Sequence, residues 1–240
     1  MKNKIAIYTA IFGGKDNLIE PEYVPKGCDF VCFSDRDFKS DIWDVRKVES
    51  KFEDPVRSAK VFKILPHKYL FEYEISVWVD GNVLIRGDLV RLIEKYLLSF
   101  NLAFFNHDEQ KKRWKKLFWI KDKGDCRDCI YDEAKHLLKI SKDRKYKDDP
   151  ILIKTQVEKY REEKYPEHNG LIAGMVILRK HNEKVVVKVM EDWWQEIKNG
   201  SRRDQLSFNY IAWKNKLDFV YMKGNVRHNK YFLHQPHRLK

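Results

Sequence analysis

The stretch Ile75-Ser76-Val77-Trp78-Val79-Asp80-Gly81-Asn82-Val83 decides which fold this chain is expected to adopt. Its β-branched and aromatic residues predict a buried strand, and the Asp-Gly-Asn at its end predicts a turn. A strand that carries a carboxylate to its C-terminal end places that group where open α/β sheets bind ligands. Oxygen ligands such as the side chains of Asp80 and Asn82 suit Mg²⁺ or Mn²⁺, which screens the charge of a nucleotide diphosphate. A plain turn is the alternative for this stretch alone.

Strand and helix patterns alternate on both sides of this stretch. A helix is predicted to start at Asp54-Pro55, because aspartate caps a helix and proline fits its first turn, and Pro66 is expected to interrupt it. Such alternation predicts an α/β layered domain. The other strands are predicted at residues 4–12, 29–33, 43–48, 102–106, 171–178 and 219–222, and the other helices at 88–99, 125–142, 151–164, 182–198 and 204–214.

Length and composition favour a single globular domain. The chain has 240 residues, of which 43% are hydrophobic and 14% aromatic, so it can bury a core and is not expected to be disordered. No repeat and no low-complexity linker divides it. No signal-peptide pattern and no apolar run of membrane-spanning length is visible, which predicts a cytoplasmic protein.

The net charge of +12 is unevenly distributed, since residues 111–164 hold 18 Lys/Arg against 11 Asp/Glu. Within this window, residues 111–121 combine six Lys/Arg with no acid and with Trp114, Phe118 and Trp119. Such a mixture suits the surface of an anionic membrane, and a solvated basic helix is the alternative. A basic balance also suits nucleic acid, but no nucleic-acid motif accompanies it, so no such partner is expected.

The four cysteines are Cys28, Cys32, Cys126 and Cys129. The last two have CxxC spacing, which is compatible with a zinc site or a redox pair. A zinc site would need two more ligands, and reduced cytosolic thiols are the simpler interpretation.

Two basic or glycine-containing patterns are suited to a nucleotide. Residues 8–14, Tyr-Thr-Ala-Ile-Phe-Gly-Gly, end the first predicted strand, where the following loop commonly holds a nucleotide; a glycine turn is the alternative. Arg57, Lys60 and Lys63 have three-residue spacing, which predicts one basic helix face able to bind pyrophosphate, or else a solvated face.

Two patterns near the C-terminus are suited to catalysis and metal binding. Residues 201–209 place the carboxylate of Asp204 and the amide of Gln205 at a helix start, where capping alone would explain them. His228, His234 and His237 follow, and a histidine can complete a divalent-metal site. Exposed histidines without a role are the alternative.

Taken together, these patterns resemble glycosyltransferases of the GT-A fold. The closer resemblance is to a family first known as a domain of unknown function and now named after plant turgor-regulation and mucilage glycosyltransferases, with bacterial members. More distantly, the chain is similar to the retaining transferases of family eight. Six motifs, in order along almost the whole chain, carry the resemblance: residues 8–16 (YTAIFGGKD), 32–35 (CFSD), 59–70 (AKVFKILPHKYL), 78–82 (WVDGN), 129–134 (CIYDEA) and 202–210 (RRDQLSFNY).

The resemblance implies one GT-A domain over residues 1–240, with a single Rossmann-like mixed sheet flanked by helices. It implies a nucleotide-sugar donor, UDP-linked by analogy, a glycan or lipid-linked acceptor, and Mn²⁺ or Mg²⁺. The implied catalytic residues are Asp204 and Gln205, and the implied metal ligands are Asp80, Asn82 and either His234 or His237. The implied donor-binding residues are Thr9, Ala10, Ile11, Phe12, Asp35, Arg57, Lys60, Lys63, Asp80, Gly81, Asn82, Ala173 and Gly174; the small pair Ala173-Gly174 would leave room for the donor sugar.

Two features depart from the family pattern. Asn82 replaces the second aspartate of the usual metal motif, and a neutral amide oxygen binds a cation more weakly than a carboxylate does. Residues 110–125 match none of the six motifs and are interpreted as a basic-aromatic insertion.

The expected reaction displaces a nucleoside diphosphate from the anomeric carbon of a sugar. A metal held by Asp80 and a C-terminal histidine, with the basic helix face, would stabilise the charge of the leaving group. For retention, Gln205 or Asp204 would steady an oxocarbenium-like state; for inversion, Asp204 would be the general base. The analogy favours retention. The alternatives are an inactive GT-A domain that binds nucleotide or glycan, a nucleic-acid-binding protein and a nucleotide-sugar hydrolase.

Overall fold

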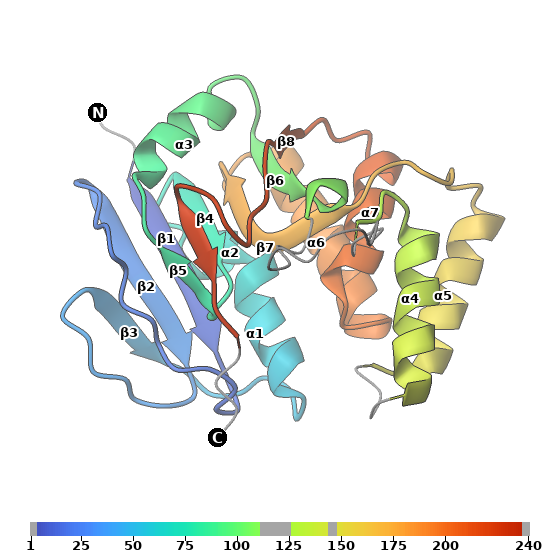
Figure 1. The fold of residues 1–240 in the computed structure, drawn as a ribbon, viewed down its shortest axis with the longest axis horizontal. Helices are drawn as coiled ribbons and strands as arrows, with labels where there is room; N and C mark the ends of the chain where they lie inside the picture. Colours follow the sequence, from blue (N-terminus) through green and yellow to red (C-terminus); the bar gives the residue numbers. More distant parts are fainter. Residues whose placement is uncertain (1–3, 111–125, 144–147, 237–240) are drawn as a thin grey trace, which may run out of the picture.

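Seven strands form one mixed sheet in the order β3-β2-β1-β4-β7-β6-β8 in this computed structural model, which describes residues 4–110, 126–143 and 148–236 (Figure 1). Strand β1 pairs in parallel with β2 and β4, whereas β7 runs antiparallel to both of its neighbours, β4 and β6. The strands are β1 (Ile5–Ile11), β2 (Cys28–Ser34), β3 (Trp43–Lys47), β4 (Ile75–Val79), β6 (Leu102–Asn106), β7 (Ile172–Arg179) and β8 (Val220–Met222).

The direction of β7 determines where the site forms. Because β7 opposes its neighbours, its first residues lie at the edge of the sheet where β1 and β4 end. The register pairs Val79, the last residue of β4, with Val176. Strand β7 therefore brings Ala173 and Gly174 to the carboxyl end of the parallel strands.

Helices cover both faces of the sheet, and two cores result. Side chains alternate along a strand, so Ala6, Tyr8 and Ala10 of β1 enter one core whereas Ile7 and Ile11 enter the other. Helices α1, α6 and α7 contribute to the first core and α3 to the second. The helices are α1 (Pro55–Ile64), α2 (Pro66–Tyr69), α3 (Leu89–Leu97), α4 (Ile130–Asp143), α5 (Pro150–Glu162), α6 (Lys184–Asn199) and α7 (Phe208–Lys214), with short 3₁₀ turns η1 (His107–Glu109) and η2 (Asp204–Leu206).

Local chemistry sets the helix starts as predicted. The side chain of Asp54 accepts a hydrogen bond from the amide of Val56, 3.0 Å away, and Asp88 caps α3 in the same way. Pro66 follows the end of α1 and begins α2, which confirms the predicted interruption. None of the helices within the described residues is long and apolar enough to cross a lipid bilayer.

The structure differs from the predicted elements in three places. The helix expected from residue 125 begins at Ile130, and the helix expected over 204–214 is divided into η2 and α7. A second, two-stranded sheet joins β5 (Val83–Ile85) to β9 (Phe232–His234), and neither strand was predicted. The predicted α/β class with one mixed sheet flanked by helices is confirmed. The single-domain assignment over residues 1–240 stays a prediction.

Candidate functional site

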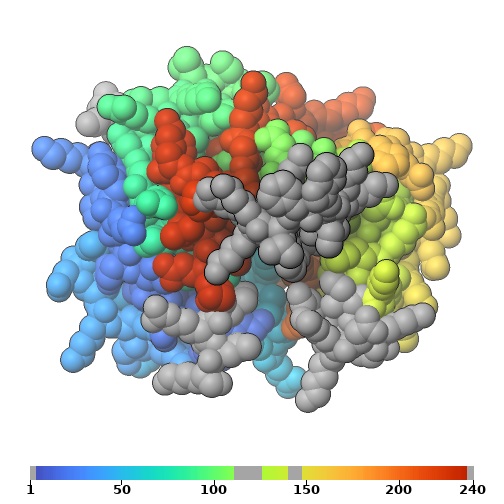
Figure 2. All heavy atoms as spheres, in the orientation of Figure 1, coloured from blue at the N-terminus to red at the C-terminus, as the bar shows by residue number. Residues whose placement is uncertain are grey.

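A cavity of about 660 Å³ opens where β1 and β4 end. Figure 2 shows the C-terminal segment, in red, lying on this face between the N-terminal half and the α4–α5 region. The β1 strand end, helix α1, the turn after β4, the start of β7 and turn η2 all supply side chains to the wall. Of the residues predicted for the site, those that line the cavity are Ala10, Ile11, Phe12, Lys60, Lys63, Asp80, Gly81, Asn82, Ala173, Gly174, Asp204, Gln205 and His234.

A network of charges occupies the centre of this wall. One oxygen of Asp204, Oδ2, lies 2.6 Å from Lys60 Nζ and 2.6 Å from Lys63 Nζ. Lys63, which is only 1% exposed, also lies 3.2 Å from Asp80 Oδ1. Trp78 Nε1 donates to that same oxygen of Asp80 at 2.7 Å. Helix α1 thus supplies two cations that join the turn after β4 to η2.

The network fixes the ionisation of its members. Burial opposes ionisation of Asp204, but Lys60 and Lys63 outweigh it and hold the pKa of this carboxyl far below its usual range. Burial lowers the pKa of Lys60, and Asp204 offsets this only in part. Lys63 is more deeply buried, but the two carboxylates beside it outweigh the effect of burial and raise its pKa. Asp204 is therefore a carboxylate with little basicity.

The smallness of Gly174 leaves space beside this network. A Cβ atom placed on Gly174 would lie 3.0 Å from Asp204 Oδ2 and 3.4 Å from Lys63 Nζ. The first distance is shorter than nearly all real Cβ contacts, so a side chain here would displace the carboxylate. The start of β7 thus offers backbone, not side chain, to a ligand beside Asp204.

The C-terminal segment brings a histidine to the Asp-Gly-Asn turn. Strand β9 pairs with β5 so that His234 lies opposite Val83, next to the turn. Asn82 Nδ2 lies 3.1 Å from His234 Nε2 and donates to the carbonyl of Gln235 at 3.2 Å. His234 therefore lines the cavity, whereas His237 lies outside the described residues.

These side chains fit a divalent cation in part. The Asp80 carboxylate and the His234 imidazole are the oxygen and nitrogen donors that Mn²⁺ accepts, and they would hold the metal. Asn82 turns its amide nitrogen toward His234 and Gln235, in keeping with its expected weakness as a ligand. A bound metal would act as a Lewis acid on the leaving phosphate.

The structure does not place Arg57 at the cavity, which corrects its predicted position. Positions three residues apart drift by about 60° around a helix, so Arg57 and Lys63 do not share one face. The guanidinium of Arg57 instead donates to the carbonyls of Ile197 and, at 2.8 Å, of Gly200, at the C-terminal end of α6. A cation at that end of a helix is stabilising.

Two other predicted donor-binding residues lie outside the cavity wall. Asp35 accepts a hydrogen bond from the amide of Gly13 at 2.9 Å, which holds the loop after β1. Thr9 lies on the opposite face of β1 from Ala10, and its buried hydroxyl has no hydrogen-bond partner among the described residues. Neither residue lines the cavity.

Sequence reasoning missed several charged residues of the cavity wall. Lys15 and Arg203 both lie within the quoted motifs, but no role was assigned to either. Arg127 and Glu133 form a buried ion pair of 2.6 Å, and Arg227 also lines the wall. Several of these residues lie within the quoted motifs, but only the tertiary structure shows which of their side chains face the cavity.

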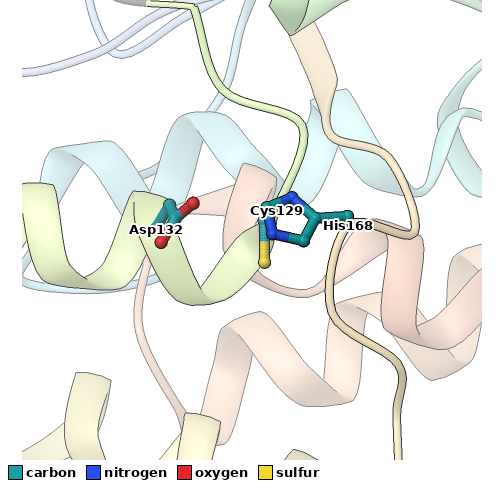
Figure 3. A group of neighbouring side chains, drawn as sticks. All are labelled: Cys129, Asp132 and His168. Atoms are coloured by element: carbon teal, nitrogen blue, oxygen red, sulfur yellow. The ribbon is translucent and has the colours of Figure 1, made fainter.

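A different cluster lies near the predicted CxxC pair. Figure 3 shows Cys129 and Asp132 from the start of α4 beside His168, and one ligand atom from each lies within 4.8 Å of the others. Asp132 is paired with Lys135 at 3.1 Å and His168 with Asp128 at 2.8 Å. These ion pairs account for the arrangement without an ion. All four cysteines are thiols.

The fold and the site define an α/β domain with one mixed sheet and a cavity at the carboxyl end of its parallel strands. The chain belongs to the TOD1/MUCI70, glycosyltransferase-like domain family, whose profile matches residues 1–232. The resemblance deduced from the six motifs is therefore confirmed.

One relative and one solved structure are similar to this chain. The chain is 25% identical over 236 residues to "Probable hexosyltransferase MUCI70" of Arabidopsis thaliana, an alignment that covers 86% of this chain and 37% of the relative. It therefore spans little more than a third of that protein. The apo structure of the bifunctional glycosyltransferase WbbM superposes on 93% of this chain and 39% of its own, with 10% identity and a TM-score of 0.48.

Proposed function

We propose that this chain is a metal-dependent glycosyltransferase domain that transfers a sugar from a UDP-linked donor to a glycan or lipid-linked acceptor with retention of configuration. One observation carries the proposal: Asp80, Lys63 and Asp204 meet beside the side-chain-free Gly174 in the cavity of a chain from a glycosyltransferase-like family. The name of the plant relative supports a hexose as the sugar.

In the proposed mechanism, the chain stabilises the leaving diphosphate and orients the sugar. Asp80 and His234 would hold the metal, which when bound would supply electrostatic stabilisation of the charge on the leaving diphosphate. Gln205 lines the cavity beside Asp204, with its side-chain nitrogen donating to the carbonyl of Ile172 at 3.2 Å. Its side-chain oxygen accepts from Arg203 Nη2 at 3.1 Å, so both ends of the amide are held beside Asp204.

Retention is favoured over inversion by the state of Asp204. An inverting reaction needs a general base with a pKa near the working pH. Lys60 and Lys63 hold the pKa of Asp204 far below that range, so it would accept a proton from an acceptor hydroxyl poorly. In a retaining reaction, Asp204 would serve as a fixed negative charge near the developing cation.

A second candidate function is an inactive domain that binds nucleotide without transfer. Two observations favour it: Asn82 stands in place of a carboxylate, and the Lys63 ammonium already neutralises Asp80 at 3.2 Å. This candidate predicts binding of UDP with no turnover of any donor.

Calorimetric titration of UDP and of GDP, with and without Mn²⁺, tests the proposal. Wild-type protein should bind UDP in a Mn²⁺-dependent manner, and Asp80→Asn should lose that dependence while keeping the size of the side chain. Asp41→Asn, at an exposed position away from the cavity, is the matched control and should bind as wild type does. Failure of both nucleotides to bind in either condition would contradict the proposed function.

A further inference from the structure

Some of the cationic side chains that line the cavity are paired with carboxylates, and others are not. Lys60 and Lys63 share the carboxylate of Asp204, and Lys63 also contacts Asp80. Lys15 and Arg203 line the same cavity from the loop after β1 and from the start of η2. Among the described residues, neither of these two has a carboxylate within hydrogen-bond distance.

Lys15 lies near charges of both signs. Within the described part of the chain, the structure gives it no hydrogen bond and no ion pair. Partial burial and the positive charges of Arg202 and Arg203 lower the pKa of Lys15, and the carboxylates of Asp54 and Asp16 offset this only in part. Arg202 is held in place by Asp54, whose two oxygens both lie 2.9 Å from Arg202 Nη1. The like charges around Lys15 are therefore fixed by the fold.

Arg203 has a donor that no acceptor among residues 4–110, 126–143 and 148–236 uses. Its Nη2 donates to Gln205 Oε1 at 3.1 Å and lies 3.8 Å from Glu133 Oε1, which is beyond hydrogen-bond length. The other oxygen of Glu133 is held by Arg127 at 2.6 Å. The Nε of Arg203 is buried and has no hydrogen-bond partner in these ranges. A buried donor without an acceptor is uncommon, and the Arg203 side chain, which is 34% exposed and lines the cavity, can reach a ligand there.

We propose that Lys15 and Arg203 form an anion clamp that binds a phosphate group of the substrate in this cavity. The clamp takes the place that the sequence assigned to Arg57, which the fold uses at the end of α6 instead. A guanidinium can bind phosphate in a bidentate manner, and an ammonium adds a point charge. Pro55 and Val56, the first residues of α1, line the same wall, where the helix dipole also favours an anion.

The inference rests on the proposed function for the identity of the ligand. The diphosphate of the nucleotide-sugar donor is the first source of such an anion, and an acidic group on the acceptor is the second. Either source would place a phosphate-like oxyanion in the cavity near Asp204. The placement of Lys15 and Arg203 in the donor cavity favours the diphosphate.

The test is calorimetric titration of uridine, UMP, UDP and inorganic phosphate into wild type, Lys15→Met, Arg203→Met and Arg203→Lys, all with Mn²⁺. In wild type, UDP should bind more tightly than UMP and uridine. Each methionine variant should lose about tenfold or more in UDP affinity, with the affinity for uridine unchanged, because a hydrogen bond to a charged group is removed.

Two further variants serve as comparisons. Arg203→Lys keeps the positive charge but loses the planar pair of guanidinium donors, so its loss of UDP affinity should be smaller. Lys26→Met, an exposed lysine of the same loop outside the cavity, should match wild type.

The outcomes separate the clamp from the proposed function. Unchanged UDP affinity with weakened binding of inorganic phosphate in the same variants would support the clamp and assign it to the acceptor. Unchanged affinity for both anions in folded Lys15→Met and Arg203→Met would overturn the clamp. Wild type that binds inorganic phosphate but no nucleotide would contradict the proposed function. The clamp would then be tested by comparing the phosphate affinity of wild type with that of the methionine variants.

Discussion

At the scale of single residues, Asp204 is the centre of the site because one of its oxygens neutralises two buried lysines. Removing that charge leaves Lys60 and Lys63 without their main counter-ion. Breaking a buried ion pair from one side costs about 3–5 kcal/mol of folding free energy. We expect Asp204→Asn to lower the free energy of unfolding by about that amount, as measured by urea denaturation at pH 7. A loss no larger than that of the exposed control Asp41→Asn would show that the pairs contribute little.

The same carboxylate makes stability depend on acid. The ordinary pKa of an aspartate is 3.8, and the two lysines hold the pKa of Asp204 far lower in the folded chain. A carboxyl whose pKa falls on folding stabilises the protein above its unfolded pKa, and this stabilisation is lost as the pH falls toward the folded pKa. The difference in unfolding free energy between wild type and Asp204→Asn should therefore be constant from about pH 5 to 7 and shrink below about pH 4. A difference independent of pH down to about pH 2.5 would contradict the assigned ionisation.

Gly174 offers a prediction that separates the sugar from the nucleotide. A Cβ atom at this position would lie 3.0 Å from Asp204 Oδ2, in the space proposed for the donor sugar. We expect Gly174→Ala to weaken the binding of a UDP-hexose by about tenfold, or ~1.4 kcal/mol, while UDP itself binds as in wild type. Paired titrations of the two ligands measure this. Equal losses for both would place the crowding at the nucleotide instead.

At the scale of secondary-structure elements, β9 matters because it carries His234 to the turn after β4. We expect His234→Ala to weaken Mn²⁺-dependent binding of UDP about 10- to 100-fold, with little change in metal-free binding. His228→Ala is the control, because His228 lies outside the cavity wall. If both variants match wild type in a titration with Mn²⁺, His234 is not a metal ligand. His237 would then be the ligand, or no histidine would bind the metal.

The basic-aromatic insertion at residues 110–125 lies almost wholly outside the described residues, so the proposed membrane contact stays a prediction. Six Lys/Arg between residues 111 and 121 should bind anionic vesicles, and binding should fall as salt increases. Flotation with phosphatidylglycerol-containing liposomes measures this, with neutral phosphatidylcholine liposomes as the control. Protein that stays at the bottom of the gradient at low salt with both lipids would contradict the idea.

The elements also show what the sequence could and could not predict. Strand β6 has the bounds expected from its apolar run, and α1 and α3 begin at their predicted caps. Strand β9 was missed because three residues, Phe232–His234, form no periodic pattern, and only pairing with β5 makes them a strand. The reversed direction of β7 depends on which neighbours it pairs with, which no local pattern records.

For the site, the sequence identified residue types better than residue contacts. Asp80 and Asp204 lie in the quoted motifs and Gly174 was implied by the family resemblance, and the fold brings all three together. Arg57 was misplaced because three-residue spacing drifts around a helix. Lys15 was overlooked because its proposed anion-binding role depends on which cations of the cavity already have carboxylate partners. Only the tertiary structure shows those pairs.

At the scale of the whole molecule, one mixed sheet, the cavity at its edge and a family assignment over residues 1–232 agree on a glycosyltransferase-like domain. The chain spans only 37% of its plant relative, so its acceptor and its donor have to be established on this chain itself. Fold alone does not fix the reaction, because related folds host unrelated chemistry.

The most direct measurement is release of UDP from a panel of UDP-hexoses by wild type and Asp80→Asn, with Mn²⁺ or with chelator, in the presence of glycan acceptors. The account predicts that wild type releases UDP from at least one donor only with metal, that the sugar appears on an acceptor, and that Asp80→Asn is inactive. Tight Mn²⁺-dependent binding of UDP without turnover of any donor in the panel would contradict it and establish a binding domain instead.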